Sequence, residues 1–236
     1  MLFWKKMPSL WIGNQIAKFN DLDTAKAIAA LKIYLTFCLF SKESNSGQRT
    51  VELTFTNLCE IASLSRSLVN EGLKILYAKG LIKNISPTVR KKIYTVDVLE
   101  SHDDGWCKLP FKGVVGEDKK ISAFQSMHNR YPFELLALQV YMYLLYARDN
   151  RSEYTLARKK TICNKLECKL PDLNKAITYL IHIGLLDNAV KKAVEKHPLE
   201  LFHDSYYFYM TTGGISALTY RKNSNLPVIS EGDLPF

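Results

Sequence analysis

Residues 55–82 read FTNLCEIASLSRSLVNEGLKILYAKGLI, and they carry the clearest pattern of secondary structure in the chain. Apolar residues recur at helical spacing on both sides of Ser63-Leu64-Ser65, which has the composition of a tight turn. Ser65 is a residue type that caps helix N-termini, and Gly80 is a common signal for the end of a helix. The stretch therefore predicts two helices joined by a turn, the first ending near Ala62 and the second at Gly80.

The flanking residues extend this pattern in both directions. Asp23 to Phe40 has apolar residues at helical spacing, and its aspartates can cap the start. Val51 to Leu53 alternates as a short strand does, and residues 81–86 and 93–99 are rich in strand formers. Residues 87–92 would form a basic hairpin loop between the last two. The predicted order is helix, strand, helix, turn, helix and two strands.

Three short segments recur in the same order about a hundred residues later, which indicates an internal duplication. Trp4–Pro8 recurs at Trp106–Pro110, Leu31–Phe37 at Leu138–Leu144, and Leu76–Ile82 at Leu180–Leu186. The polar run from Ser101 to Gly105 lies between the copies and predicts a boundary there. We expect one domain at residues 1–100, a second at 101–222, and a loose tail at 223–236.

The second copy predicts the same order of elements. Its helices are expected at Phe133–Ala147, at Thr155–Leu166, and from Pro171 to Gly184, and its strands at Leu185–Val190 and Tyr206–Met210, with a basic loop at 191–204 and a short helix at 216–221. The fold class expected from both copies is α+β and mainly α.

This order, found twice, resembles the winged helix-turn-helix family, and the resemblance covers nearly the whole chain. It rests on Phe55 to Leu81 with the loop at 87–92, and on Thr155 to Leu186 with its own loop. The resemblance implies two tandem winged-helix domains. Tandem winged helices of about this size are similar to replication initiators of plasmids and other mobile elements, and to some transcriptional regulators. The Trp-x-Lys-x-Pro segment before each copy is similar to one in replication-type helix-turn-helix proteins.

In this family the helix after the turn lies in the major groove and presents its N-terminal residues to base edges. Its outward positions here are Ser65, Arg66, Ser67, Asn70 and Lys74 in the first copy, and Lys169, Asn174, Lys175 and Thr178 in the second. Asparagine can pair with an adenine edge, and Arg66 suits guanine. The hairpin-loop residues that would contact phosphates are Arg90, Lys91, Lys92, Lys191, Lys192 and Lys196.

Simpler interpretations of these residues stay open. Asn70 and Asn174 can be solvated helix residues, and the loop lysines can be an ordinary charged hairpin. Trp4 and Trp106 are expected to be packing residues, with base stacking as the other interpretation. The strand of aromatic residues near Tyr206 fits a core or a dimer contact better than a stacking platform.

Composition limits the class of protein further. Hydrophobic residues make up 47% and charged residues 23% of the 236, which excludes a mostly disordered chain. No apolar stretch is long enough to cross a bilayer, and the N-terminus does not resemble a signal peptide. Five cysteines without a CxxC pair indicate reduced thiols. We therefore expect a cytoplasmic protein, associated with nucleoid or plasmid DNA, with no membrane partner.

The net charge of +9 favours a partner rich in phosphate. Motifs for nucleotide binding, metalloprotease chemistry and serine hydrolysis are not found, so we predict no enzyme activity, catalytic residue, cofactor or metal. The leading hypothesis is sequence-specific binding of double-stranded DNA. The alternative is a scaffold subunit of a chromosome-organising complex, although such subunits tend to be acidic. A homodimer, and contact with replication or transcription machinery, stay open, as does whether both copies bind DNA or one dimerises.

Overall fold

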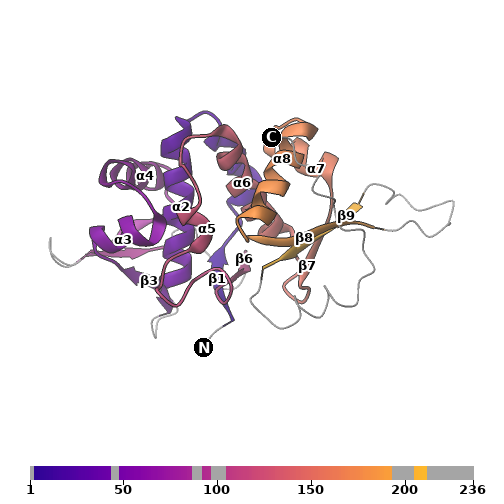
Figure 1. The fold of residues 1–236 in the computed structure, drawn as a ribbon. Coiled ribbons are helices and arrows are strands. Elements are labelled where there is room, and N and C mark those ends of the chain that lie inside the picture. The colour runs from indigo at the N-terminus through magenta and orange to yellow at the C-terminus, as the bar shows by residue number, and fades with distance from the viewer. Residues whose placement is uncertain (1–2, 44–47, 87–91, 97–104, 193–204, 212–236) are drawn as a thin grey trace.

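The computed structural model describes residues 3–43, 48–86, 92–96, 105–192 and 205–211. These residues form eight α-helices, a short 3-10 helix and nine strands in three sheets, which agrees with the predicted mixture of helix and strand. Figure 1 shows two helical groups, each with a sheet beside it, meeting at the centre of the molecule. No helix within the described residues is long and apolar enough to cross a bilayer.

Two long helices, α2 (Thr24–Phe40) and α6 (Pro132–Ala147), form the centre of the core and contact each other (Figure 1). Asp23 caps α2 by accepting a hydrogen bond from the Lys26 backbone N–H, and Pro132 occupies the first turn of α6. Both helices are apolar on nearly all sides, and most of their residues are buried. A helix of this composition is stable only when other elements surround it.

The helix pair predicted from residues 55–82 is confirmed as α3 (Phe55–Ala62) and α4 (Arg66–Ala78). Thr54 and Ser65 cap the two N-termini, each accepting a backbone N–H through its hydroxyl oxygen. Ser63 ends α3 in the left-handed conformation, with φ of 50°. Buried apolar residues on the inner face of α4 pack it against α2.

The corresponding pair in the second half is α7 (Lys159–Leu166) and α8 (Leu170–His182). These helices have 8 and 13 residues, the same lengths as α3 and α4, and Glu167 takes the left-handed conformation that Ser63 has. The predicted start of the first of them at Thr155 is wrong, because Tyr154–Arg158 is strand β7. Thr155 is buried and donates its hydroxyl hydrogen bond to the Leu144 carbonyl, and pairing with a neighbouring strand outweighs local helix propensity.

Each half carries a small antiparallel sheet beside its helix pair. The first has the order β2-β3-β5-β4, with β2 at Lys42–Glu43, β3 at Arg49–Glu52, β4 at Lys83–Asn84 and β5 at Ile93–Thr95. The second has the order β7-β9-β8, with β8 at Leu186–Lys191 and β9 at Ser205–Met210. Strand β4 is shorter than predicted from residues 81–86, because the Leu81 backbone N–H still belongs to the end of α4, where it donates to the Leu76 carbonyl.

The two Trp-x-Lys-x-Pro segments pair with each other across the halves. Strand β1 (Trp4–Pro8) lies antiparallel to β6 (Trp106–Pro110), and Lys6 stands opposite Lys108 at the middle of this ribbon. The short helix that follows each of these strands also packs against the other half. Helix α1 (Ile12–Gln15), which precedes the 3-10 helix at Ala17–Phe19, contacts α6, and α5 (Ser122–Gln125) contacts α3. Each half therefore packs its first segment on the other half, and the Gln125 side-chain amide donates to the Glu60 carbonyl.

Several predicted features lie outside the described residues. They are the boundary between residues 100 and 101, most of the basic loops at 87–92 and 191–204, the short helix at 216–221 and the tail at 223–236.

Candidate nucleic-acid interface

The outward face of α4 gathers the predicted contact residues of the first half. Val69, Leu73 and Leu76 are buried on its inner face. The outward side chains are all exposed: Ser65, Arg66, Ser67, Asn70 and Lys74. The inner and outward faces predicted from helical spacing are thus confirmed for α4.

Contacts at the start of α4 hold its arginine in place. The Arg66 guanidinium donates to the Thr56 hydroxyl oxygen at 3.3 Å and lies 6.0 Å from the centre of the Phe55 ring. The Ser65 hydroxyl oxygen is engaged as the helix cap, so mainly its O–H is left to donate to a ligand. Arg66 is therefore held ready at the positive end of the helix dipole.

Two other outward residues of α4 differ in their surroundings. Lys74 lies 2.7 Å from a Glu71 carboxylate oxygen, and Lys26 on α2 approaches the other at 3.3 Å. Hydrogen bonds from these two lysines hold the pKa of Glu71 below its ordinary value. A phosphate would have to compete with Glu71 for Lys74. Asn70 makes no side-chain hydrogen bond to the described residues, so its amide is open to a ligand.

The second half presents a different helix tip. Helix α8 begins with Leu170 and Pro171, Leu170 is 50% exposed, and Asp172 lies in the first turn. Asn174 accepts a hydrogen bond from the Lys159 ammonium at 2.8 Å, and the Lys175 ammonium lies 4.6 Å from the centre of the Phe133 ring. Lys169 and Thr178 are exposed on the same side. The four predicted residues thus share one face, but its tip is apolar and acidic where that of α4 is basic.

The predicted loop residues are described only in part. Lys92 precedes β5 and is half-buried, Lys191 ends β8 and is exposed, and the Lys192 backbone N–H donates to the Ser205 carbonyl. Arg90, Lys91 and Lys196 lie outside the described residues.

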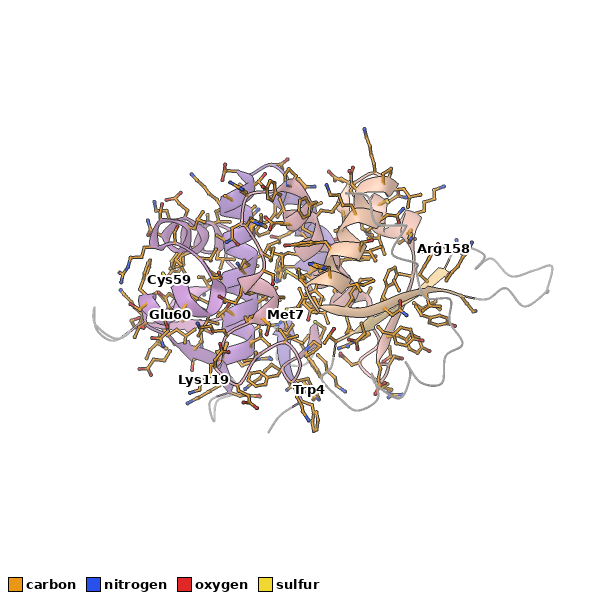
Figure 2. The ribbon with its side chains drawn as sticks, viewed as in Figure 1. Trp4, Met7, Cys59, Glu60, Lys119 and Arg158 are labelled. Atoms are coloured by element: carbon orange, nitrogen blue, oxygen red, sulfur yellow. The ribbon has the colours of Figure 1, made fainter. Side chains whose placement is uncertain are left out.

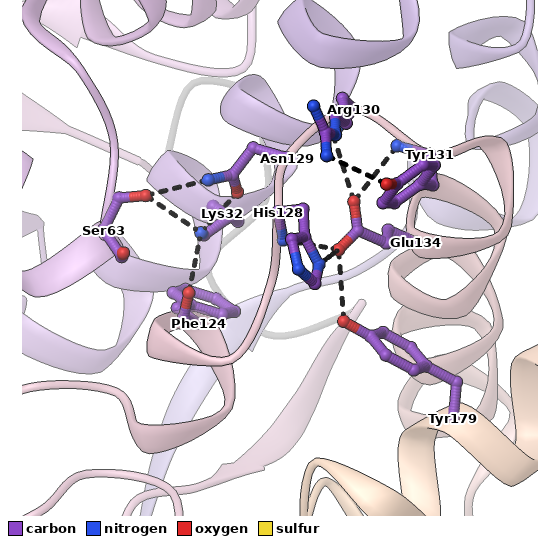
Figure 3. A network of polar contacts seen from close by, with 9 residues as sticks. All are labelled: Lys32, Ser63, Phe124, His128, Asn129, Arg130, Tyr131, Glu134 and Tyr179. Carbon is purple, nitrogen blue, oxygen red and sulfur yellow. Dashed lines mark hydrogen bonds and ion pairs between the residues drawn. The ribbon is translucent and has the colours of Figure 1, made fainter.

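A buried lysine fixes the turn between α3 and α4 from behind (Figure 3). Lys32 on α2 is fully buried, and its ammonium donates to the Asn129 side-chain oxygen at 2.6 Å and to the Phe124 and Ser63 carbonyls at 3.2 and 3.3 Å. Asn129 also donates its amide to the Ser63 carbonyl. These three acceptors match the three N–H groups of an ammonium. The turn of the first half is therefore held by residues of both halves.

A buried carboxylate lies next to this cluster. Glu134 accepts hydrogen bonds from the backbone N–H groups of His128, Arg130 and Tyr131 at 2.6, 3.0 and 3.1 Å, and from the Tyr179 hydroxyl on α8 at 3.2 Å (Figure 3). Burial alone would raise the pKa of Glu134, but these donors together hold it below its ordinary value. The sequence analysis did not single out Lys32 or Glu134. A charged residue in an apolar helix does not reveal which distant residues it contacts.

Stability should depend on pH through Lys32. Burial lowers its pKa from 10.5 to about 7, against the attraction of Glu134, which raises it. Between these values the unfolded chain binds the proton and the folded chain releases it, so this group makes stability rise with pH.

We expect the loss of unfolding free energy caused by Lys32→Met to be larger at about pH 8 than at about pH 6, as measured by urea titration. Thiols such as Cys107, whose pKa burial raises to about 12, act in the opposite direction at high pH, but both proteins contain them. An equal loss at both pH values would show that Lys32 does not titrate in this window.

Comparison of the chain with models of protein families, with curated proteins and with solved structures found no match. Within the described residues, no group of three or more histidine, cysteine, aspartate or glutamate side chains is arranged to hold a metal ion.

Proposed function

We propose that this chain is a sequence-specific double-stranded DNA-binding protein with two tandem winged helix-turn-helix units. The observation that carries the proposal is the outward face of α4, where Arg66 and Asn70 are exposed next to each other at the helix start. A second helix pair of the same lengths and the same turn conformation supports a second unit. The net charge of +9 supports a partner that carries phosphates.

In the proposed complex α4 enters the major groove with its N-terminus foremost. Arg66 donates two hydrogen bonds to a guanine edge, and Asn70 pairs with an adenine edge. Lys74 and the loop lysines neutralise phosphates and position the helix without reading sequence. Helix α8 adds Asn174 and Lys175, with a smaller share of the affinity because its tip carries Leu170 and Asp172.

A chain of this kind acts by occupying DNA. We place it among replication initiators of plasmids or mobile elements, or transcriptional regulators, in the cytoplasm and on nucleoid or plasmid DNA. Catalysis is no part of the proposal. One observation favours the alternative of a scaffold subunit for the second unit, namely that Leu170 is half exposed at the α8 tip. Such an apolar tip fits a protein partner or a second copy of the chain better than a phosphate.

The test is fluorescence anisotropy with labelled duplexes from the neighbourhood of the gene, against random duplex, over a salt series. The protein should prefer one of the former, and its affinity should fall steeply with salt. Arg66→Ala/Asn70→Ala should weaken the preferred complex about tenfold or more and affect random duplex less. The control, Asn14→Ala/Lys120→Ala, removes an exposed amide and an exposed cation away from α4 and should bind as the parent does.

Two results would count against the proposal. Unchanged affinity in the α4 variant would show that this face does not read DNA. Weak binding without sequence preference in the parent protein would favour the scaffold function, and the search would turn to a protein partner.

A further inference from the structure

The ribbon of β1 and β6 carries an aromatic stack on one face. Trp4 and Trp106, one from each strand, have ring centres 5.7 Å apart and planes 11° from parallel. Both side chains are only half-buried, and Figure 2 shows Trp4 projecting from the lower edge of the molecule. The two indoles therefore pack on each other, as the predicted packing role requires, but each also keeps part of its surface exposed.

Two lysines flank this stack on the same face. The Lys6 ammonium lies 5.3 Å from the centre of the Trp106 ring, and the Lys108 ammonium lies 5.0 Å from the centre of the Trp4 ring. The same two lysines stand directly opposite each other in the ribbon. Among the described residues neither has a carboxylate within ion-pair distance. Like charges in this position destabilise a strand pair, so the face is set up to meet an anion.

Further residues continue the same combination of charge and ring. Phe3 precedes Trp4 and is 61% exposed, and the Lys112 ammonium lies 4.9 Å from the centre of its ring. Figure 1 shows the ribbon at the lower side of the molecule, with α4 and α8 above it. The aromatic ribbon is defined as Trp4, Lys6, Trp106 and Lys108, with Phe3 and Lys112 at its end; it belongs to β1 and β6 and not to α4 or α8.

We propose that the aromatic ribbon binds single-stranded DNA, with its lysines on phosphates and its indoles stacked on unpaired bases. A base stacked on an aromatic side chain is held more strongly than a lysine that lies over an exposed indole. A base can therefore replace the ammonium on the outer face of the stack, and the released lysine then binds the adjacent phosphate. Duplex DNA hides its base faces and offers this ribbon phosphates alone.

The inference extends the proposed DNA-binding function to a second surface, and one experiment separates the two. Single-stranded oligothymidylate of about 20 nucleotides, long enough for such a site, is titrated into the full chain. We expect it to quench tryptophan fluorescence, with an affinity that falls as salt rises. Lys6→Gln/Lys108→Gln should weaken this binding about tenfold and leave duplex binding through α4 unchanged. Arg66→Ala/Asn70→Ala should do the reverse.

A second variant tests the rings themselves. Trp4→Phe/Trp106→Phe leaves the buried Trp11 as fluorophore, so quenching should vanish, while anisotropy of a labelled oligonucleotide should show several-fold weaker binding. Removing two opposed lysines should leave the melting temperature equal or higher, which confirms that the lysine variant is folded. Unchanged oligothymidylate affinity in both ribbon variants would overturn the proposal, as would equal competition by random duplex, since phosphate contact alone would then explain binding.

Discussion

At about pH 6, where Lys32 carries its charge, Lys32→Met is expected to lower the free energy of unfolding by about 3–5 kcal/mol, the usual effect of removing one side of a buried charged cluster. Methionine fills much of the same volume, but it donates no hydrogen bond. The Ser63 and Phe124 carbonyls would lose the ammonium donor, as would the Asn129 side-chain oxygen. Each buried acceptor without a partner costs about 1–3 kcal/mol. Glu134 would also lose its electrostatic attraction to the Lys32 ammonium, which raises the pKa of Lys32 against the effect of burial.

Urea titration measures this loss, and the same helix offers a control. Lys26 lies on α2 with its side chain 47% exposed and paired with Glu71, so Lys26→Met should change stability by less than about 1 kcal/mol. A loss below about 1 kcal/mol for Lys32→Met would mean that water or a shifted side chain replaces the ammonium. The cluster around Lys32 would then contribute little to the free energy of unfolding.

The same substitution should weaken duplex binding more than its effect on stability alone. Ser63 ends α3 two residues before Ser65, the cap of α4, and its carbonyl accepts hydrogen bonds from both Lys32 and Asn129. When that anchor is lost, the turn becomes free to move, and Arg66 and Asn70 lose their fixed position relative to the groove. Measured where more than nine-tenths of the variant is folded, DNA affinity should therefore fall, whereas single-strand binding at the aromatic ribbon should be retained.

Local patterns predicted the elements whose causes are local. The bounds of α3 and α4 depend on Thr54, Ser65 and Gly80, which act within one helical turn, and a single sequence shows them. Strand β7 was predicted as helix because its identity depends on pairing with β9, about fifty residues away in the chain. A distant partner of this kind leaves no mark on the residues of the strand itself.

The candidate sites divide in the same way. Exposure of Arg66, Asn70 and Asn174 follows from helical spacing and was predicted. The repeat showed that Trp4 and Trp106 occupy equivalent places, but it could not show that the two copies pair with each other, since pairing within each half would leave the same pattern. The cluster of Lys32 and Glu134 was missed for a related reason, because it joins segments from both halves.

Gly72→Val is the second substitution with a large expected effect, on the order of 3 kcal/mol of lost stability. Gly72 is buried where α4 crosses α2, and a Cβ placed on it would lie 2.7 Å from the Ile33 side chain and 3.0 Å from backbone atoms of Ala29 and Ala30. The Ile33 methyl can rotate away, but the backbone of α2 cannot, so α4 must move outward. Valine has a higher helix propensity than glycine, but this stabilises α4 by less than about 1 kcal/mol.

Ala78→Val is the matched control, because it places the same isopropyl side chain at an exposed position of α4 and should cost less than about 0.5 kcal/mol. Thermal and urea unfolding compare the two variants, and duplex anisotropy shows whether the displaced helix still reads DNA. Ala176 occupies the equivalent buried place on α8, so the second half accommodates a methyl group there and the helices of the first half pack more closely. If Gly72→Val matched the control in stability, α4 would be free to shift against α2, and a rigidly held Arg66 could not be the source of sequence preference.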